Sequence, residues 1–179
     1  MTGVGRKELA VERFAIKDLI AWKNSPRRRP LLVQGARQVG KTWLIREFGQ
    51  THFAAVAYVN FLEDEAMARQ FEGELAPARL LDAVTLYTGV NAKDPNTLVV
   101  FDEIQECPRA LTSLKSFAER SPETALVAAG SLLGVALHRG VSFPVGKVDH
   151  LLIYPLSFDE FLLATGNNLM LDTLRRGDL

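Results

Sequence analysis

The chain has 179 residues, of which 47% are apolar and 23% are charged, a composition typical of globular proteins rather than disordered or fibrous ones. No apolar run approaches the roughly 18 residues of a membrane-spanning helix, the N-terminal sequence lacks a secretory apolar core, and the single cysteine, Cys107, excludes an intrachain disulfide. The 21 basic and 21 acidic residues cancel, although residues 1–50 hold 11 basic against 4 acidic side chains. We therefore expect a cytoplasmic protein without membrane contact.

The first third of the chain predicts a helix, a strand and a second helix. Residues 9–23 place most of their large apolar side chains on one side of a 3.6-residue period. Pro26 and Pro30 then end helical geometry, and the apolar residues 31–34 predict a buried strand that leads into a glycine-bearing turn. Residues 41–48 follow as the second helix.

Strands and helices alternate through the rest of the chain. Further strands are predicted at residues 54–62, 97–101, 125–129 and 148–153, and helices near residues 63–71, 77–87, 109–120 and 132–137. The run 97–101 is apolar throughout, which is typical of a central parallel strand covered on both faces. Five strands that alternate with helices predict an α/β fold with a parallel sheet between two layers of helices. Pro155 ends the last strand, and Ser157 with the acids Asp159 and Glu160 predicts a capped helix start.

A phosphate-binding sequence lies between the first strand and the second helix. Residues 35–42, GARQVGKT, match G-x-x-x-x-G-K-[ST], and this strand–turn–helix setting disfavours the alternative of a chance match. Glycines let the backbone curl so that its N–H groups point at phosphate oxygens, and the helix N-terminus adds positive potential. Lys41 is expected to reach the β- and γ-phosphates, and Thr42 to offer its hydroxyl to magnesium. The predicted nucleotide-binding residues are Gly35, Ala36, Arg37, Gln38, Val39, Gly40, Lys41, Thr42 and Trp43.

The two acidic residues after the apolar run 97–101 supply a second part of such a site. Asp102 fits the role of holding magnesium opposite the phosphate loop, so Thr42 and Asp102 are the candidate metal ligands. Glu103 projects differently and can polarise a water for in-line attack on the γ-phosphorus. A solvated strand end would be the favoured interpretation if no phosphate loop preceded it.

The fourth predicted strand ends at Gly130 and Ser131. A small polar side chain at this position can meet the γ-phosphate or the attacking water. A second role, capping the helix that follows, is equally favoured for Ser131. With Lys41 and Glu103, Ser131 completes the set of candidate catalytic residues.

The sequences GARQVGKT, FLED, VVFDEIQECP, AAGSLLG and YPLSFDEFL occur in this order between residues 31 and 163. On these motifs the chain resembles the AAA-type branch of P-loop ATPases, in particular prokaryotic ATPases that continue into a C-terminal domain of poorly understood role. The resemblance implies a three-layer P-loop fold with strand order five, one, four, three, two, and ATP and Mg²⁺ as ligands. It also implies an ATPase core at residues 1–155 and the start of a helical C-terminal region at residues 156–179, which we expect to be truncated.

AAA-type enzymes commonly complete their site with an arginine from a neighbouring copy in a homo-oligomer or from a second domain. Arg139 and Lys147 lie in the right stretch of the chain for this role, although a solvated loop is the favoured interpretation for both. Arg37 is another candidate, but we expect its side chain to point away from the phosphates because the loop binds through its backbone.

The leading hypothesis is a magnesium-dependent ATP hydrolase whose nucleotide cycle drives a conformational change in a C-terminal or partner domain. A nucleotide-gated binding module with little turnover is the first alternative. The second is a DNA-associated regulator with contacts from the basic residues 27–29 or from the C-terminal region that we expect to be missing. The run 27–29 is short and has no aromatic neighbours for base stacking, so a solvated loop is favoured for it. A small-molecule kinase ranks last because the Asp-Glu pair suits water better than a substrate hydroxyl.

Overall fold

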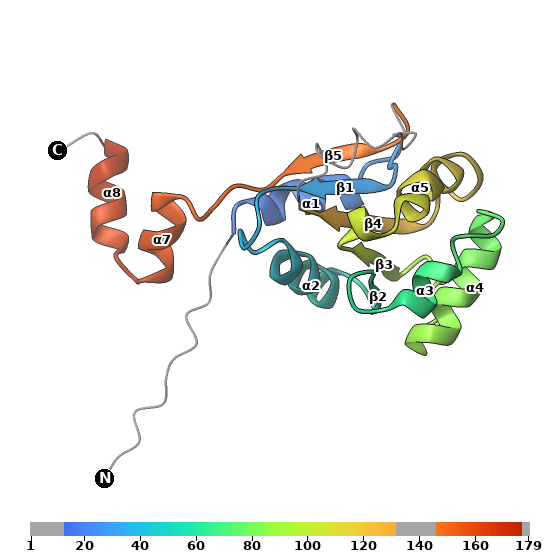
Figure 1. Cartoon of the computed structure of the whole chain (residues 1–179). Helices are drawn as coiled ribbons and strands as arrows, with labels where there is room; N and C mark the ends of the chain where they lie inside the picture. Colours follow the sequence, from blue (N-terminus) through green and yellow to red (C-terminus); the bar gives the residue numbers. More distant parts are fainter. Residues whose placement is uncertain (1–12, 132–145, 177–179) are drawn as a thin grey trace, which may run out of the picture.

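The computed structural model describes residues 13–131 and 146–176, in which strands and helices alternate along the chain (Figure 1). In order, the elements are α1 (Ala15–Lys23), β1 (Leu31–Gln34), α2 (Lys41–His52), β2 (Ala55–Asn60), α3 (Glu65–Arg69), α4 (Pro77–Thr88), β3 (Thr97–Asp102), the 3₁₀ turn η1 (Ile104–Glu106), α5 (Pro108–Arg120), β4 (Ala125–Gly130), β5 (Asp149–Leu152), α7 (Phe158–Ala164) and α8 (Asn168–Arg176).

The strands form one parallel sheet in the order β2-β3-β4-β1-β5. This confirms the α/β fold and the strand order five, one, four, three, two. Leu32 of β1 lies opposite Ala128 of β4 on one side and His150 of β5 on the other, so β4 separates β1 from β3. Because the strands share one direction, the segments that follow β1, β3 and β4 meet at the carboxyl-terminal end of the sheet. This end is the usual place for a ligand in such folds.

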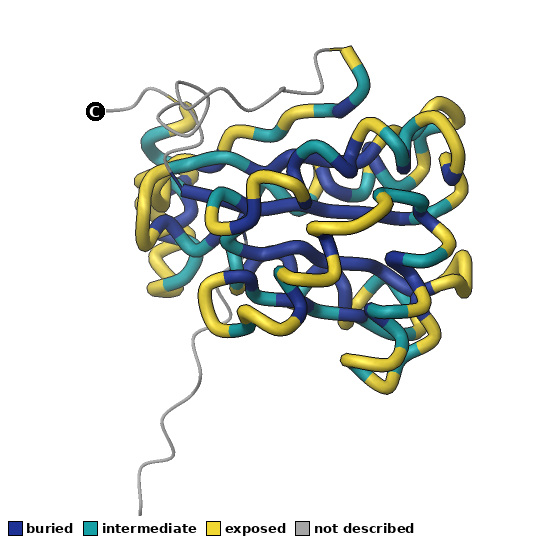
Figure 2. Tube along the Cα trace, turned by 45° about the vertical axis from the view of Figure 1, so that its right-hand side comes forward, coloured by how far each residue is buried: buried dark blue, intermediate teal, exposed yellow. Residues whose placement is uncertain are grey.

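Helices cover both faces of the sheet, because alternate strand residues point to opposite sides. On one face, Val33 and Val100 pack with α1 and α2, and on the other Phe101 packs with α3, α4 and α5. All six residues of β3 are buried, as its apolar sequence predicts. The inner strands β1, β3 and β4 accordingly run through the buried centre of the molecule, with exposed loops around them (Figure 2). The expected three-layer arrangement is confirmed.

The observed helix after the phosphate loop is longer than predicted. It was expected at residues 41–48 and continues to His52. Packing supports the extra turn, because Gly49 is buried and the ring of His52 lies 5.0 Å from the ring of the fully buried Phe48.

Two later segments also differ from their predictions. The helix expected at residues 63–71 is shorter and forms α3. It starts after Asp64, whose side chain accepts a hydrogen bond from the Met67 amide at 2.7 Å and caps the helix. The short turn η1 was not predicted. The helix expected near residues 132–137 lies outside the described residues.

Two helices, α7 and α8, lie against each other beyond the end of β5 (Figure 1). Helix α7 starts with a capping box, in which Ser157 Oγ accepts from the Glu160 amide at 3.2 Å and the Glu160 carboxylate accepts from the Ser157 amide at 2.7 Å. The predicted helix start at Ser157 is therefore confirmed. A search of the described helices finds none with the length and apolar character needed to cross a membrane.

Candidate active site

The phosphate loop, residues 35–42, connects β1 to α2 by a backbone path that needs small residues. Gly40 has a left-handed φ of 87° and is the N-cap of α2, and it supplies no capping side chain, which leaves the first amides of the helix to a ligand or to water. Gly35 lies so close to the end of β5 that a Cβ there would be 2.4 Å from the backbone oxygen of Ile153. The loop therefore has the backbone cradle that a phosphate group requires.

Lys41 lies inside this loop and is 6% exposed. Its Nζ donates hydrogen bonds to the carbonyl oxygens of Gly35 at 3.1 Å and Ala36 at 2.7 Å, and to Ser131 Oγ at 3.0 Å. Burial lowers the pKa of Lys41, and the charges of Glu103 and Asp102 partly oppose that shift. The contact with Ser131 brings together two predicted catalytic residues that are 90 positions apart.

Thr42 and Asp102 meet at the carboxyl-terminal end of the sheet. Thr42 Oγ1 donates to Asp102 Oδ2 at 2.8 Å, and the Glu103 amide donates to Asp102 Oδ1 at 2.9 Å. Asp102 is 2% exposed and ends β3. A hydroxyl and a carboxylate at this separation offer only oxygen atoms, the ligands that Mg²⁺ prefers, so the residues present fit a magnesium ion beside a bound triphosphate.

Tyr58 of β2 also contacts Asp102, and it was not among the predicted site residues. Its hydroxyl donates to Asp102 Oδ2 at 2.6 Å, and the guanidinium of Arg46 lies over its ring, 4.1 Å from the centroid. Burial and the neighbouring Asp102 carboxylate raise the pKa of the phenol. Tyr58 lies opposite Val100 in the sheet, and Val100 is two positions before Asp102 in β3. A hydroxyl at this register beside the predicted metal ligand is the signal that could have identified it.

Glu103 departs from the direction of β3, with a left-handed φ of 49° that is uncommon for a residue with a side chain. The Gln105 side-chain amide donates to its carboxylate. Glu103 and Gln105 line a hollow of about 650 Å³ together with Lys41, Ser131 and the half-exposed Trp43. Gln105 is a second residue that the sequence did not indicate, because only the turn η1 brings it back to Glu103.

A family model described as an AAA domain matches residues 27–162. The chain belongs to the AAA domain family. Among solved structures, the Walker-type ATPase PABY2304 of Pyrococcus abyssi matches this AAA domain with a TM-score of 0.57 and 18% identity, over 92% of this chain and 59% of that protein. PCH-2 of C. elegans matches with a TM-score of 0.43 and 16% identity, over 91% of this chain and 46% of that one. The first likeness supports the fold alone, and no protein with a curated description matches the sequence.

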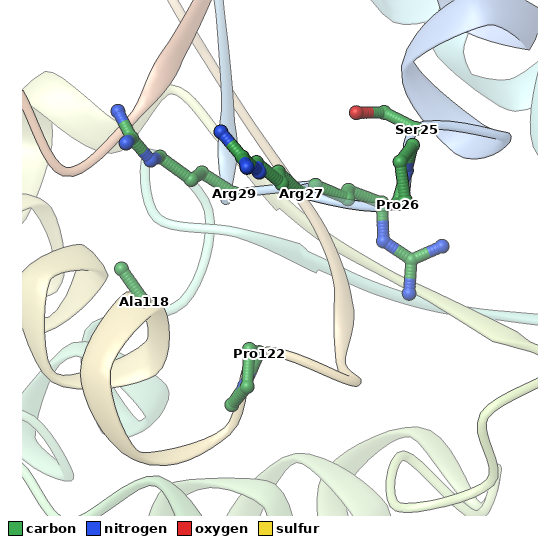
Figure 3. Close-up of a pocket in the computed structure, with 7 residues that line it drawn as sticks. Ser25, Pro26, Arg27, Arg29, Ala118 and Pro122 are labelled. Atoms are coloured by element: carbon green, nitrogen blue, oxygen red, sulfur yellow. The ribbon is translucent and has the colours of Figure 1, made fainter.

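The basic residues 27–29 of the AAA domain border a separate pocket of about 430 Å³ (Figure 3). Arg28 donates to the Glu123 carbonyl oxygen at 2.7 Å, and Arg29 donates to the Gly146 carbonyl oxygen at 2.8 Å. These hydrogen bonds tie the loop before β1 to the loops before β4 and β5. Arg28 and Arg29 therefore connect these loops in the structure.

The basic residues considered as partners of a neighbouring site differ in their positions. Lys147 precedes β5, at the end of the sheet opposite the phosphate loop. It forms an ion pair with Glu119 at 3.1 Å. It therefore lies away from the phosphate loop of this chain. Arg139 is outside the described residues. Arg37 is exposed and lines the hollow beside Lys41.

Proposed function

We propose that this AAA domain binds ATP with Mg²⁺ and hydrolyses its γ-phosphate with water. The observation that carries the proposal is the 2.8 Å hydrogen bond between Thr42 and Asp102, because it joins the phosphate loop to the carboxylate at the end of β3. Structural likeness to a Walker-type ATPase supports the fold on which this arrangement rests.

The phosphate loop accounts for binding. Backbone amides of residues 35–42 surround the phosphates, and Lys41 offsets their negative charge. In the structure the Lys41 ammonium is held by the Gly35 and Ala36 carbonyls and by Ser131. We expect phosphate oxygens to replace the carbonyl contacts, while Ser131 stays close enough to contact the γ-phosphate.

Thr42 and Asp102 are the residues that would hold magnesium, and Tyr58 fixes the Asp102 carboxylate from the side of β2. When bound, the ion offsets charge on the β- and γ-phosphates. The direct hydrogen bond between Thr42 and Asp102 keeps both oxygen ligands in place before nucleotide arrives.

Glu103 acts on the water. Its carboxylate takes a proton as the water oxygen bonds to the γ-phosphorus and the bond from that phosphorus to the bridging oxygen breaks, which yields ADP and phosphate. Gln105 donates to the Glu103 carboxylate and so orients it toward the hollow. Glu103 and Lys41 are thus assigned as catalytic residues, and Ser131 as a residue that contacts the γ-phosphate.

The first experiment measures nucleotide binding by calorimetry for the parent chain and for Lys41→Ala, with Lys93→Ala as a control. Lys93 forms an exposed ion pair with Asp82, remote from the hollow. We expect Lys41→Ala to weaken ATP affinity at least tenfold and Lys93→Ala to leave it unchanged. Equal affinity in all three proteins would contradict the assigned binding site.

The site lacks a basic residue that could reach the γ-phosphate from outside the phosphate loop, among the described residues that line the hollow. Among the described residues that line the hollow, Arg37 is the one arginine, and it belongs to the phosphate loop itself. We propose that a neighbouring copy or a partner domain supplies another. If a neighbouring copy supplies it, specific ATPase activity should rise with protein concentration. Tight ATP binding with negligible turnover at every concentration would instead favour the nucleotide-gated binding module.

A further inference from the structure

Arg13 and Glu160 form a buried ion pair between two ends of the described chain. Arg13 Nε donates to Glu160 Oε1 at 3.2 Å, and each side chain is only 6% exposed. The residues are 147 positions apart, since Arg13 precedes α1 and Glu160 lies in the first turn of α7. A buried charge is costly unless its hydrogen bonds are satisfied, so the remaining contacts of the pair decide what it does.

Arg13 uses its other nitrogens to hold the phosphate loop. One guanidinium nitrogen donates to the Val39 carbonyl oxygen at 2.9 Å, and the other donates to the Tyr154 carbonyl oxygen at 2.8 Å. The C=O and N–H of a planar trans peptide point in opposite directions, so the bond to Val39 also sets the direction of the Gly40 N–H. A Cβ on Gly40 would lie 3.2 Å from the same guanidinium, which places Arg13 directly against the turn into α2.

Glu160 connects that arginine to helix α7. Its Oε1 accepts from the Phe14 amide at 2.8 Å as well as from Arg13, and its Oε2 accepts from the Ser157 amide at 2.7 Å. The carboxylate therefore belongs at once to the capping box of α7 and to the contact that anchors Arg13. A shift of α7 cannot leave the Arg13–Val39 contact unchanged unless Glu160 separates from Arg13.

We propose that Arg13 and Glu160 are a positioning pair that couples the phosphate loop to helix α7. Glu160 holds Arg13 against the Val39 carbonyl, so the conformation in which the loop amides bind phosphate depends on the position of α7. Coupling between two sites is reciprocal, so nucleotide in the loop must also change how firmly α7 is held. This inference rests on the proposed nucleotide binding and names the path by which it reaches the C-terminal helices.

The test uses Glu160→Gln, which keeps the size of the side chain but only one acceptor oxygen for the Phe14 and Ser157 amides, and which removes the charge that fixes Arg13. Asp159→Asn is the matched control, because Asp159 is the neighbouring residue of α7 and its ion pair with Arg175 is exposed. Nucleotide affinity is measured by calorimetry, and hydrogen–deuterium exchange of residues 157–164 is compared with and without nucleotide.

We expect Glu160→Gln to weaken ATP affinity by about 5- to 150-fold, the usual range of coupling between sites, and to abolish the nucleotide-dependent protection of α7. Asp159→Asn should change neither quantity. The inference is overturned if Glu160→Gln binds ATP with the affinity of the parent and its α7 amides respond to nucleotide as the parent's do.

One measurement needs no variant and therefore holds even if Glu160→Gln fails to fold. In the parent chain, ATP should slow amide exchange in residues 157–164. A parent that binds ATP without any change in this segment contradicts the coupling alone. A parent that binds no ATP contradicts the proposed function itself, so the two failures are distinguishable.

Discussion

Tyr58 and Asp102 are joined by a hydrogen bond of 2.6 Å from the phenol to carboxylate Oδ2, the same oxygen that accepts from Thr42 at 2.8 Å. Two donors on neighbouring elements thus fix one carboxylate oxygen from two sides. Partners that orient a metal ligand commonly affect metal affinity as much as activity. Tyr58 is therefore expected to act on magnesium through Asp102.

Tyr58→Phe removes this hydrogen bond and keeps the ring beneath Arg46. We expect a loss of about 1.5–3 kcal/mol in the free energy of unfolding, as for a hydrogen bond to a charged group. The Mg²⁺ concentration at half-maximal ATPase activity should rise. Urea unfolding and a Mg²⁺ titration check the two effects, with Tyr87→Phe as the control because the half-exposed Tyr87 contacts Asp64 rather than the site. An unchanged Mg²⁺ requirement would argue against this role.

Gly35→Ala tests the close approach of the phosphate loop to the end of β5. The added Cβ would lie 2.4 Å from the Ile153 backbone oxygen, so the loop or the strand must move. We expect the free energy of unfolding to fall by about 1–3 kcal/mol, the usual cost of overpacking, and nucleotide affinity to fall as well. Gly73→Ala is the control, since the nearest atom to its Cβ would be 3.8 Å away on the Arg79 side chain. Equal melting temperatures for the two variants would contradict the prediction.

The buried ion pair between Arg13 and Glu160 predicts that the free energy of unfolding depends on pH. Burial alone would raise the pKa of Glu160, but hydrogen bonds from the Ser157 and Phe14 amides and the charge of Arg13 outweigh it and lower the pKa below its ordinary value of 4.5. The folded chain thus holds this proton less tightly than the unfolded chain. Glu160 therefore stabilises the fold above pH 4.5, and the contribution is lost as the pH falls through the lower folded pKa.

The measurement compares urea unfolding of the parent chain and of Glu160→Gln between neutral and acidic pH. Their difference in unfolding free energy should be largest near neutrality and should shrink as the pH falls below 4.5, where the parent carboxyl becomes neutral. A difference that stays constant over this range would mean that the charge of Glu160 does not stabilise the folded chain.

Local sequence patterns were sufficient to predict most strands and helices and to locate the phosphate loop. The apolar run of β3 predicted a fully buried strand, and residues 35–42 identified the segment that joins β1 to α2. Ser157 and Glu160 predicted the start of α7, because a capping box involves only positions three apart. These features depend on neighbours in the sequence, which is why the sequence alone indicates them.

Local sequence patterns could not predict contacts between residues that are far apart in the chain. Tyr58 reaches Asp102 because β2 pairs with β3, and Arg13 reaches the Val39 carbonyl because α1 packs beside α2. The sequence shows neither pairing directly. It also gave no sign that Glu103 adopts a left-handed backbone, which turns its carboxylate out of the strand and toward Gln105.

Single-turnover hydrolysis by Glu103→Gln tests the central claim most directly. The substitution keeps the size of the side chain and removes the carboxylate that would accept the proton, so we expect ATP affinity near that of the parent and hydrolysis slowed by at least about 100-fold, within the usual range for a general base. The measurement follows ATP bound and phosphate released in the same sample. Tight binding with almost no phosphate is the predicted result, and hydrolysis at the parental rate would contradict the account.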